Sequence, residues 1–175
     1  MPRNSFKYFF AINLLTLFIV VQSLWSLEGK EYQIKGAMMI NFIKFVQWPE
    51  SSDTTITIGI VGKNNFGSTL DQIDGRTIGE KQILIRRINS TSRIADCQVL
   101  FISASESDRY YQILREVAGT PVLTIGEDED FLRLGGIIRF YTEKEHIRFE
   151  ISQSAAQKSN LKLSAKLLEI ATVIP

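Results

Sequence analysis

The stretch that most constrains the fold is Cys97-Gln98-Val99-Leu100-Phe101-Ile102, a short apolar run in a chain of 175 residues. A run of this kind is typical of an interior strand of a sheet, so we expect Cys97, which opens it, to be buried. Similar runs alternate with helical segments, and this alternation favours parallel strands joined by crossover helices. Further strands are predicted at Thr55–Val61, Ile83–Ile88 and Pro121–Ile125, with helices near Ser68–Ile73 and at Ser107–Val117.

The pattern changes after Gly135-Gly136. Two strands, Ile137–Thr142 and His146–Ile151, flank a short charged turn, and apolar and charged side chains alternate in the second of them, which predicts an antiparallel hairpin. A last helix is predicted over Leu161–Ala171. The expected fold class is therefore α/β, with a mostly parallel sheet flanked by helices and ending in an antiparallel hairpin and a C-terminal helix, in a single domain over residues 27–175.

The first 26 residues are predicted to be a signal peptide. Arg3 and Lys7 precede an apolar stretch, and small residues follow at Ser23 and Ser26, which is the order of a basic region, an apolar region and a cleavage site. A retained membrane anchor is the alternative, but the apolar stretch is shorter than the ~20 residues that a spanning helix needs. We therefore expect export, with cleavage within residues 23–26.

The charge of the chain is balanced. The full sequence carries a formal charge of +1, and loss of Arg3 and Lys7 with the signal peptide would leave −1. There is no block of basic residues, so nucleic acid is not expected as a partner. The remaining ~150 residues are enough to bury a core in one domain.

A first helix is predicted over Glu31–Gln47, ending at Trp48-Pro49 because proline cannot continue a helix. Its apolar side chains spread over roughly half of the circumference at 100° per residue, which is more than one face against a sheet requires. This width predicts either deep burial of the helix or a second contact, such as a partner.

Five residues are the candidates for binding a partner or a ligand: Gln47, Trp48 and Pro49 at the end of the first helix, and Lys162 and Ser164 at the start of the last one. If both helices lie on one side of the sheet, these residues would line a shallow pocket with an aromatic floor and an ammonium and a hydroxyl at its edge. Such a pocket suits a small carboxylate or a peptide segment. The alternative is that Trp48 packs in the core and that Lys162 lies in solvent.

The chain offers little for catalysis. Cys97 and His146 are single residues of their types and lie on separate predicted strands, whereas a cysteine nucleophile needs a neighbouring histidine and exposure. Cys97 stays a candidate redox residue, although it has no second cysteine for an intramolecular disulfide. The acidic run at residues 127–130 lacks the spacing of a calcium loop and predicts a solvated turn. No catalytic residue, metal site or cofactor is predicted.

Five stretches spread over almost the whole mature chain carry a family resemblance. They are Asn41–Pro49, Cys97–Ser103, Asp130-Phe131 followed by Gly135-Gly136, Ile147–Ile151 and Leu163–Leu168. Each is weakly specific alone, but in this order they resemble the YfiR-like (YfiR/HmsC) periplasmic regulatory domain family.

The resemblance implies a periplasmic protein that binds the periplasmic region of an inner-membrane diguanylate cyclase and represses it, which lowers cyclic-di-GMP signalling and biofilm formation. Related domains also precede membrane histidine kinases, which implies the alternative of a small-ligand-binding sensor domain that acts with a membrane receptor or kinase. A homodimer and a small ligand both stay open. The chain departs from the family pattern at Cys97, which lacks the paired cysteines of characterised members, and at Ser152, which replaces the usual Asn but keeps a helix-capping side chain.

Overall fold

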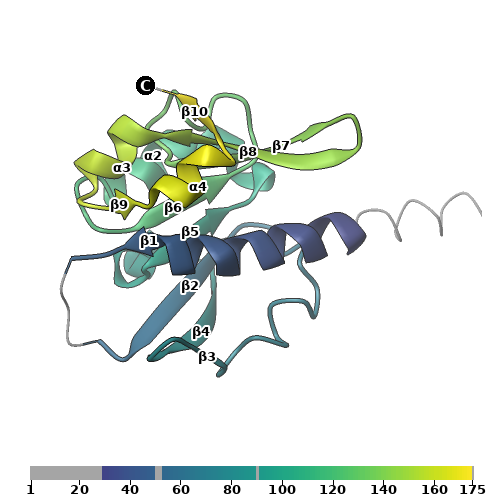
Figure 1. Ribbon diagram of the computed structural model, residues 1–175, viewed down its shortest axis with the longest axis vertical. Helices are drawn as coiled ribbons and strands as arrows, with labels where there is room; N and C mark the ends of the chain where they lie inside the picture. The colour runs from purple at the N-terminus through teal and green to yellow at the C-terminus, as the bar shows by residue number, and fades with distance from the viewer. Residues whose placement is uncertain (1–28, 50–52, 90, 175) are drawn as a thin grey trace, which may run out of the picture.

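The structure is a computed structural model that describes residues 29–49, 53–89 and 91–174. The signal peptide predicted for residues 1–26 lies outside the described residues. The described part contains a twisted sheet with helices on both faces and a separate two-stranded ribbon (Figure 1).

An eight-stranded sheet forms the centre of the molecule, in the strand order β10-β8-β7-β6-β5-β2-β4-β3. Five of its seven neighbouring pairs are parallel, and β7–β8 and β3–β4 are antiparallel. The predicted α/β class, with a mostly parallel sheet and an antiparallel hairpin, is confirmed. The strands are β2 (Thr55–Val61), β3 (Thr77–Ile78), β4 (Lys81–Ile88), β5 (Val99–Ile102), β6 (Leu123–Gly126), β7 (Ile138–Glu143), β8 (His146–Ser152) and β10 (Thr172–Ile174).

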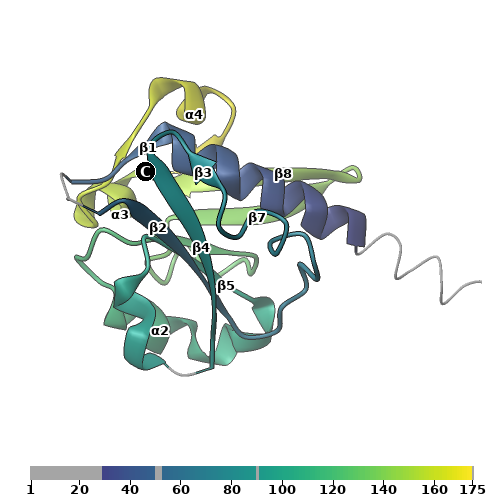
Figure 2. The same ribbon diagram turned by 90° about the horizontal axis from the view of Figure 1, so that it is seen from below.

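Helices cover both faces of the sheet and create two apolar cores. The helix at residues 29–45 lies along one face, and α2 (Tyr110–Glu116) lies on the other (Figure 2). In the first core the Phe42 ring lies 5.7 Å from that of Phe140 and 4.9 Å from that of Phe149, so the helix packs directly on the hairpin strands. In the second core Tyr110 and its α2 neighbours pack with the short helix η1 (Thr91–Asp96) over β2 and β5.

The second core does not extend over the hairpin. Among the described residues, it includes none from β7, β8 or β10. Ile138 and Phe140 of β7 face the first core, whereas Arg139 points to the opposite face and pairs across the strands with Glu150 of β8. The half of this sheet face over the hairpin therefore carries polar side chains, and among the described residues it lies outside the second core.

The C-terminal helix is shorter than the sequence predicts. α3 (Gln153–Lys158) ends before Asn160, whose φ of 54° cannot continue a helix, and β9 (Lys162–Leu163) follows. α4 (Ala165–Glu169) begins at Ser164, whose hydroxyl caps it by accepting a hydrogen bond from the Leu167 amide. The chain then returns to the sheet as β10. The apolar residues predicted to form one helix are therefore divided between a ribbon strand and a short helix, and the edge strand begins after them.

Two internal helices also differ from expectation. Residues 68–73 form consecutive turns rather than a helix. The helix predicted from Ser107 begins as the 3-10 helix η2 (Ala104–Arg109), which Ser103 caps, and becomes α2 only at Tyr110. The non-helical φ of −106° at Glu106 separates the two turns of η2.

Candidate functional site

The candidate residues at the two ends of the chain come together in a two-stranded ribbon. β1 (Val46–Gln47) follows the helix directly and pairs antiparallel with β9, which places Gln47 opposite Lys162. The Ser164 amide donates to the Phe45 carbonyl at 2.9 Å and extends the pairing by one residue. We call this element the β1–β9 ribbon, defined by residues 45–49 and 162–164. It joins the end of the first helix to the start of α4.

Trp48 links the ribbon to the sheet. Its indole Nε1 donates to the Gln98 carbonyl at 3.3 Å, just before β5, and the ring is half-buried against the first core. The indole therefore packs inward on one side while part of it stays accessible. This arrangement combines the two readings that the sequence left open, core packing and a contact surface.

The two polar candidates on the C-terminal side, Ser164 and Lys162, do not line a common pocket with Trp48. The Ser164 hydroxyl accepts from the Leu167 amide at 3.2 Å and is used as a helix cap. Lys162 is exposed and borders a hollow of about 210 Å³ that is lined by α3 and β9. Trp48 is not among the residues that line this hollow, so the structure gives Lys162 no aromatic floor.

An apolar flank of the first helix continues from the ribbon. At 100° per residue, Ile34, Met38 and Phe45 lie within 40° of one another, about 120° away from the middle of the buried face. Ile34 is 49% exposed, and Met38 and Phe45 are half-buried. The Lys166 ammonium lies 5.4 Å from the centre of the Phe45 ring. The unusual width of the apolar arc therefore reflects side chains that the core does not cover.

A buried polar cluster lies at the other end of the same helix. Lys35 is 5% exposed and pairs with Glu31 on its own helix and with Glu127, which follows β6. The Tyr32 hydroxyl donates to Glu127 at 3.1 Å and accepts from the Asn65 amide at 2.9 Å. Burial raises the pKa of Tyr32, with the nearby carboxylates adding to the effect and the Asn65 hydrogen bond opposing it.

Sequence reasoning missed this cluster and predicted a solvated turn at residues 127–130. The turn is solvated at Glu129 and Asp130, but the Glu127 side chain is only 10% exposed. A usable signal was present in the sequence: Lys35 falls on the buried helix face between Tyr32 and Met39, where an unpaired charge would be costly. A lysine at such a position implies a buried acidic partner.

Cys97 is buried, as the sequence predicts, with 2% of its surface exposed. Burial raises the pKa of its thiol, while Arg86 opposes the effect. The sulfur lies among Gly59, Ile88 and Leu100 of the neighbouring strands, close enough that a Cβ added at Gly59 would approach the Sγ to 2.8 Å. A thiol in this position is protonated and inaccessible, which are the properties of an unreactive cysteine.

The described residues contain neither a metal-binding group nor a cysteine–histidine pair. Within residues 29–49, 53–89 and 91–174, no group of three or more His, Cys, Asp or Glu side chains is arranged so that it could hold a metal ion. His146 is exposed at the tip of the hairpin, where its Nδ1 lies 2.7 Å from the Lys144 carbonyl, and Cys97 is buried in the second core. In the same described ranges no helix has the length and apolar character to cross a membrane.

Comparison with known proteins gives a family and a fold. A family model described as YfiR/HmsC-like matches residues 32–172. Among solved structures, an ABC domain from Streptococcus pneumonia in complex with L-Trp matches with a TM-score of 0.50 and 10% identity, over 68% of this chain and 55% of that one. A conserved domain protein from Vibrio cholerae O1 biovar El Tor matches with a TM-score of 0.50 and 9% identity, over 81% and 59%. The chain thus spans little more than half of either structure, and these likenesses concern the fold alone.

Proposed function

The chain belongs to the YfiR/HmsC-like family of periplasmic regulatory domains, and we propose that it binds the periplasmic region of an inner-membrane diguanylate cyclase and holds that enzyme inactive. Repression would lower cyclic-di-GMP and biofilm formation. The domain would reach the periplasm through the signal peptide predicted at residues 1–26, and the membrane partner would carry the signal inward.

The observation that carries the proposal is the apolar flank of the first helix beside the β1–β9 ribbon. Ile34 leaves half of its side chain in water, and Met38, Phe45 and Trp48 are each only partly covered. Aromatic and aliphatic side chains that are half-packed in the free protein make good anchors, because a partner completes their burial at little cost in conformational entropy. The exposed Gln47 and Lys162 supply the polar rim of such an interface.

Ile34→Glu tests the surface without disturbing the core, because Ile34 is already half-exposed. We expect the variant to keep its melting temperature and to lose co-purification with the periplasmic region of the membrane cyclase. Cellular cyclic-di-GMP should rise to the level of a deletion strain. Leu84→Glu is the matched control, since it places the same charge at an exposed apolar residue of β4, away from the first helix.

Two results would overturn the proposal. One is a deletion strain whose cyclic-di-GMP and surface attachment do not change while the wild type expresses the protein. The other is an equal effect of Ile34→Glu and Leu84→Glu on cyclase binding, which would remove the helix flank from the interface.

Export is checked separately by N-terminal sequencing of the periplasmic protein. We expect the sequence to start between Leu24 and Leu27, and an intact Met1 would contradict export with cleavage.

A further inference from the structure

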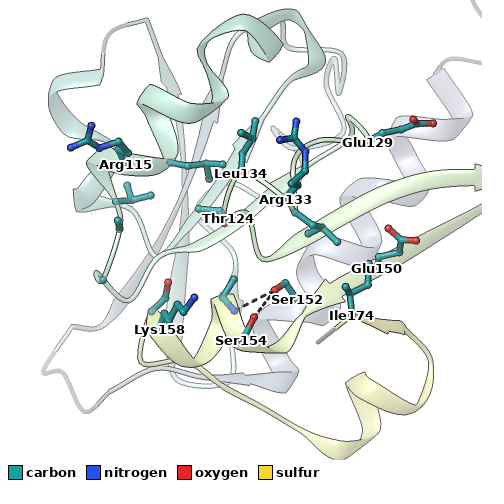
Figure 3. Close-up of a pocket in the computed structure, with 18 residues that line it drawn as sticks. Arg115, Thr124, Glu129, Arg133, Leu134, Glu150, Ser152, Ser154, Lys158 and Ile174 are labelled. Carbon is teal, nitrogen blue, oxygen red and sulfur yellow. Dashed lines mark hydrogen bonds between the residues drawn. The ribbon is translucent and has the colours of Figure 1, made fainter.

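A hollow lies on the sheet face opposite the first helix, where the second core ends. It measures about 580 Å³, which is within the range of small-molecule binding sites. The end of α2 and the loop between β6 and β7 form one wall, and α3 forms the other, with the ends of β8 and β10 below (Figure 3). The hollow therefore exists because α2 covers β2 and β5 but not the hairpin.

The loop wall of this pocket is rigidly held. Phe131 is fully buried and its ring lies against two glycines, so closely that a Cβ added at Gly126 would come within 2.4 Å of the ring and one at Gly136 within 2.2 Å. The Gly136 amide donates to the Phe131 carbonyl at 2.9 Å, which closes the loop on itself. Leu132 and Leu134 are thereby fixed as the apolar lining. A pocket whose wall is preformed loses little entropy when it binds a ligand.

Cationic residues from three separate elements line the hollow: Arg115 from α2, Arg133 from the loop and Lys158 from α3. The Arg115 guanidinium lies 5.6 Å from the centre of the Tyr111 ring, and Figure 3 shows it directed away from the hollow. Arg133 is paired with Asp130 at the surface, whereas within residues 29–49, 53–89 and 91–174 neither Arg115 nor Lys158 has an ion pair. All three are exposed and carry long, mobile side chains that can turn toward a bound anion.

The two acidic residues of the lining do not cancel this charge inside the pocket. Glu150 is neutralised by Arg139, whose Nη2 lies 2.7 Å from its Oε2 on the neighbouring strand. Glu129 is exposed at the edge, and Figure 3 shows its carboxylate directed away from the hollow. The hydroxyls of Thr124 and Ser152 lie at the base. The Thr124 hydroxyl accepts a hydrogen bond from the Ile137 amide at 3.0 Å. The Ser152 hydroxyl accepts one from the Ala155 amide and shares another with the Ser154 hydroxyl at 3.2 Å.

We infer that this pocket binds a small organic acid with an apolar body, the body against Leu132, Leu134 and Ile174 and the anionic group toward Lys158 and Arg133. The inference stands apart from the proposed repression, because the pocket lies on the opposite sheet face from the first helix and shares no residue with the β1–β9 ribbon. A ligand of this class would make the domain a sensor as well as a binding protein.

The probe is 8-anilinonaphthalene-1-sulfonate, whose fluorescence reports an apolar site next to a positive charge, with octanoate and octanol as competitors. We expect saturable one-to-one binding to the folded protein, and displacement by octanoate at about tenfold lower concentration than by octanol. Lys158→Gln/Arg133→Gln should weaken dye binding about tenfold. Lys44→Gln/Arg76→Gln, which removes the same charges from exposed positions outside the pocket, should not.

A second variant tests the location without changing charge. Ala118→Trp places an indole at the exposed rim just after α2 and should block the dye while near-ultraviolet circular dichroism stays that of the wild type. Amide shifts on octanoate addition should centre on Leu134, Ser152 and Lys158. Equal competition by octanol, equal weakening in the control double variant, or shifts centred on the β1–β9 ribbon would each overturn the inference. So would binding seen only with vesicles of anionic phospholipid.

Discussion

The Lys35 ammonium lies 2.5 Å from the Glu127 carboxylate, although 92 residues separate them in the chain, and both side chains are at least nine-tenths buried. This pair fastens the first helix to the end of β6. Because the same helix continues into the β1–β9 ribbon, the pair also sets the position of the apolar flank that we propose as the partner surface.

Breaking this pair on one side should be costly. Lys35→Met leaves the Glu127 charge buried without its partner, and we expect the free energy of unfolding to fall by about 3 kcal/mol in urea titrations. Lys44→Met, an exposed lysine of the same helix, should change it by less than about 0.5 kcal/mol.

The double variant Lys35→Met/Glu127→Gln separates pairing from packing. Removing both charges should lower the unfolding free energy by clearly less than the sum of the two single substitutions. The reason is that the double variant, unlike either single variant, leaves no unpaired charge of this pair buried. Strictly additive losses would show that the two side chains do not interact in solution.

The sequence predicts the interior of this fold better than its margins. The bounds of β2 agree with prediction, and β5 lies within the predicted run of residues 97–102, because both strands are buried on both faces, which leaves an unbroken apolar run. β1, β9 and β10 were not predicted, since two or three residues cannot show a period and their place depends on partners more than 100 residues away or across a helix. The same holds for the site: the sequence predicts that Gln47 and Lys162 share a surface only if both helices lie on one side of the sheet, and it does not predict the strand pairing that places them opposite each other.

Gly126 provides a test of the rigid loop between β6 and β7. Gly126→Ala would push a methyl group into the Phe131 ring, and we expect a loss of about 1–3 kcal/mol in unfolding free energy. Combining it with Phe131→Leu should recover part of the loss, because the smaller side chain makes room. Gly29→Ala, where nothing lies within 4 Å, is the control and should be neutral or slightly stabilising. An unaffected Gly126→Ala protein would mean that the loop adjusts freely.

Cys97 should be nearly inert in the folded protein. Alkylation by a soluble maleimide should be slow until denaturant is added, and reductant should not change the melting temperature. Fast labelling of the native protein would contradict the burial of its thiol.

The raised pKa of the Cys97 thiol also predicts a pH dependence of stability. Folding favours the protonated thiol, so its contribution is complete below the ordinary thiol pKa of 9.0 and is lost as pH rises toward the higher pKa of the native state. Between about pH 8 and pH 10 the wild type should therefore lose more stability than Cys97→Ala, which has no thiol to ionise. Parallel pH profiles for the two proteins would show that the thiol is not perturbed.

Two substitutions of Trp48, one to Phe and one to Ala, can separate its role in stability from its role in partner binding. Trp48→Phe keeps an aromatic ring against the first core but removes the hydrogen bond from Nε1 to the Gln98 carbonyl, which should cost about 1 kcal/mol of unfolding free energy. Trp48→Ala also removes the ring and should cost about 2 kcal/mol or more of unfolding free energy. The loss should be smaller than for a fully buried indole, because the side chain is half-exposed.

If Trp48 is an anchor for the cyclase, the Trp48→Phe variant should still bind the cyclase and the Trp48→Ala variant should not. Both variants are measured below the melting temperature of the less stable one. Retained binding and repression by a folded Trp48→Ala protein would make the indole purely a packing residue and would confine the interface to the flank around Ile34.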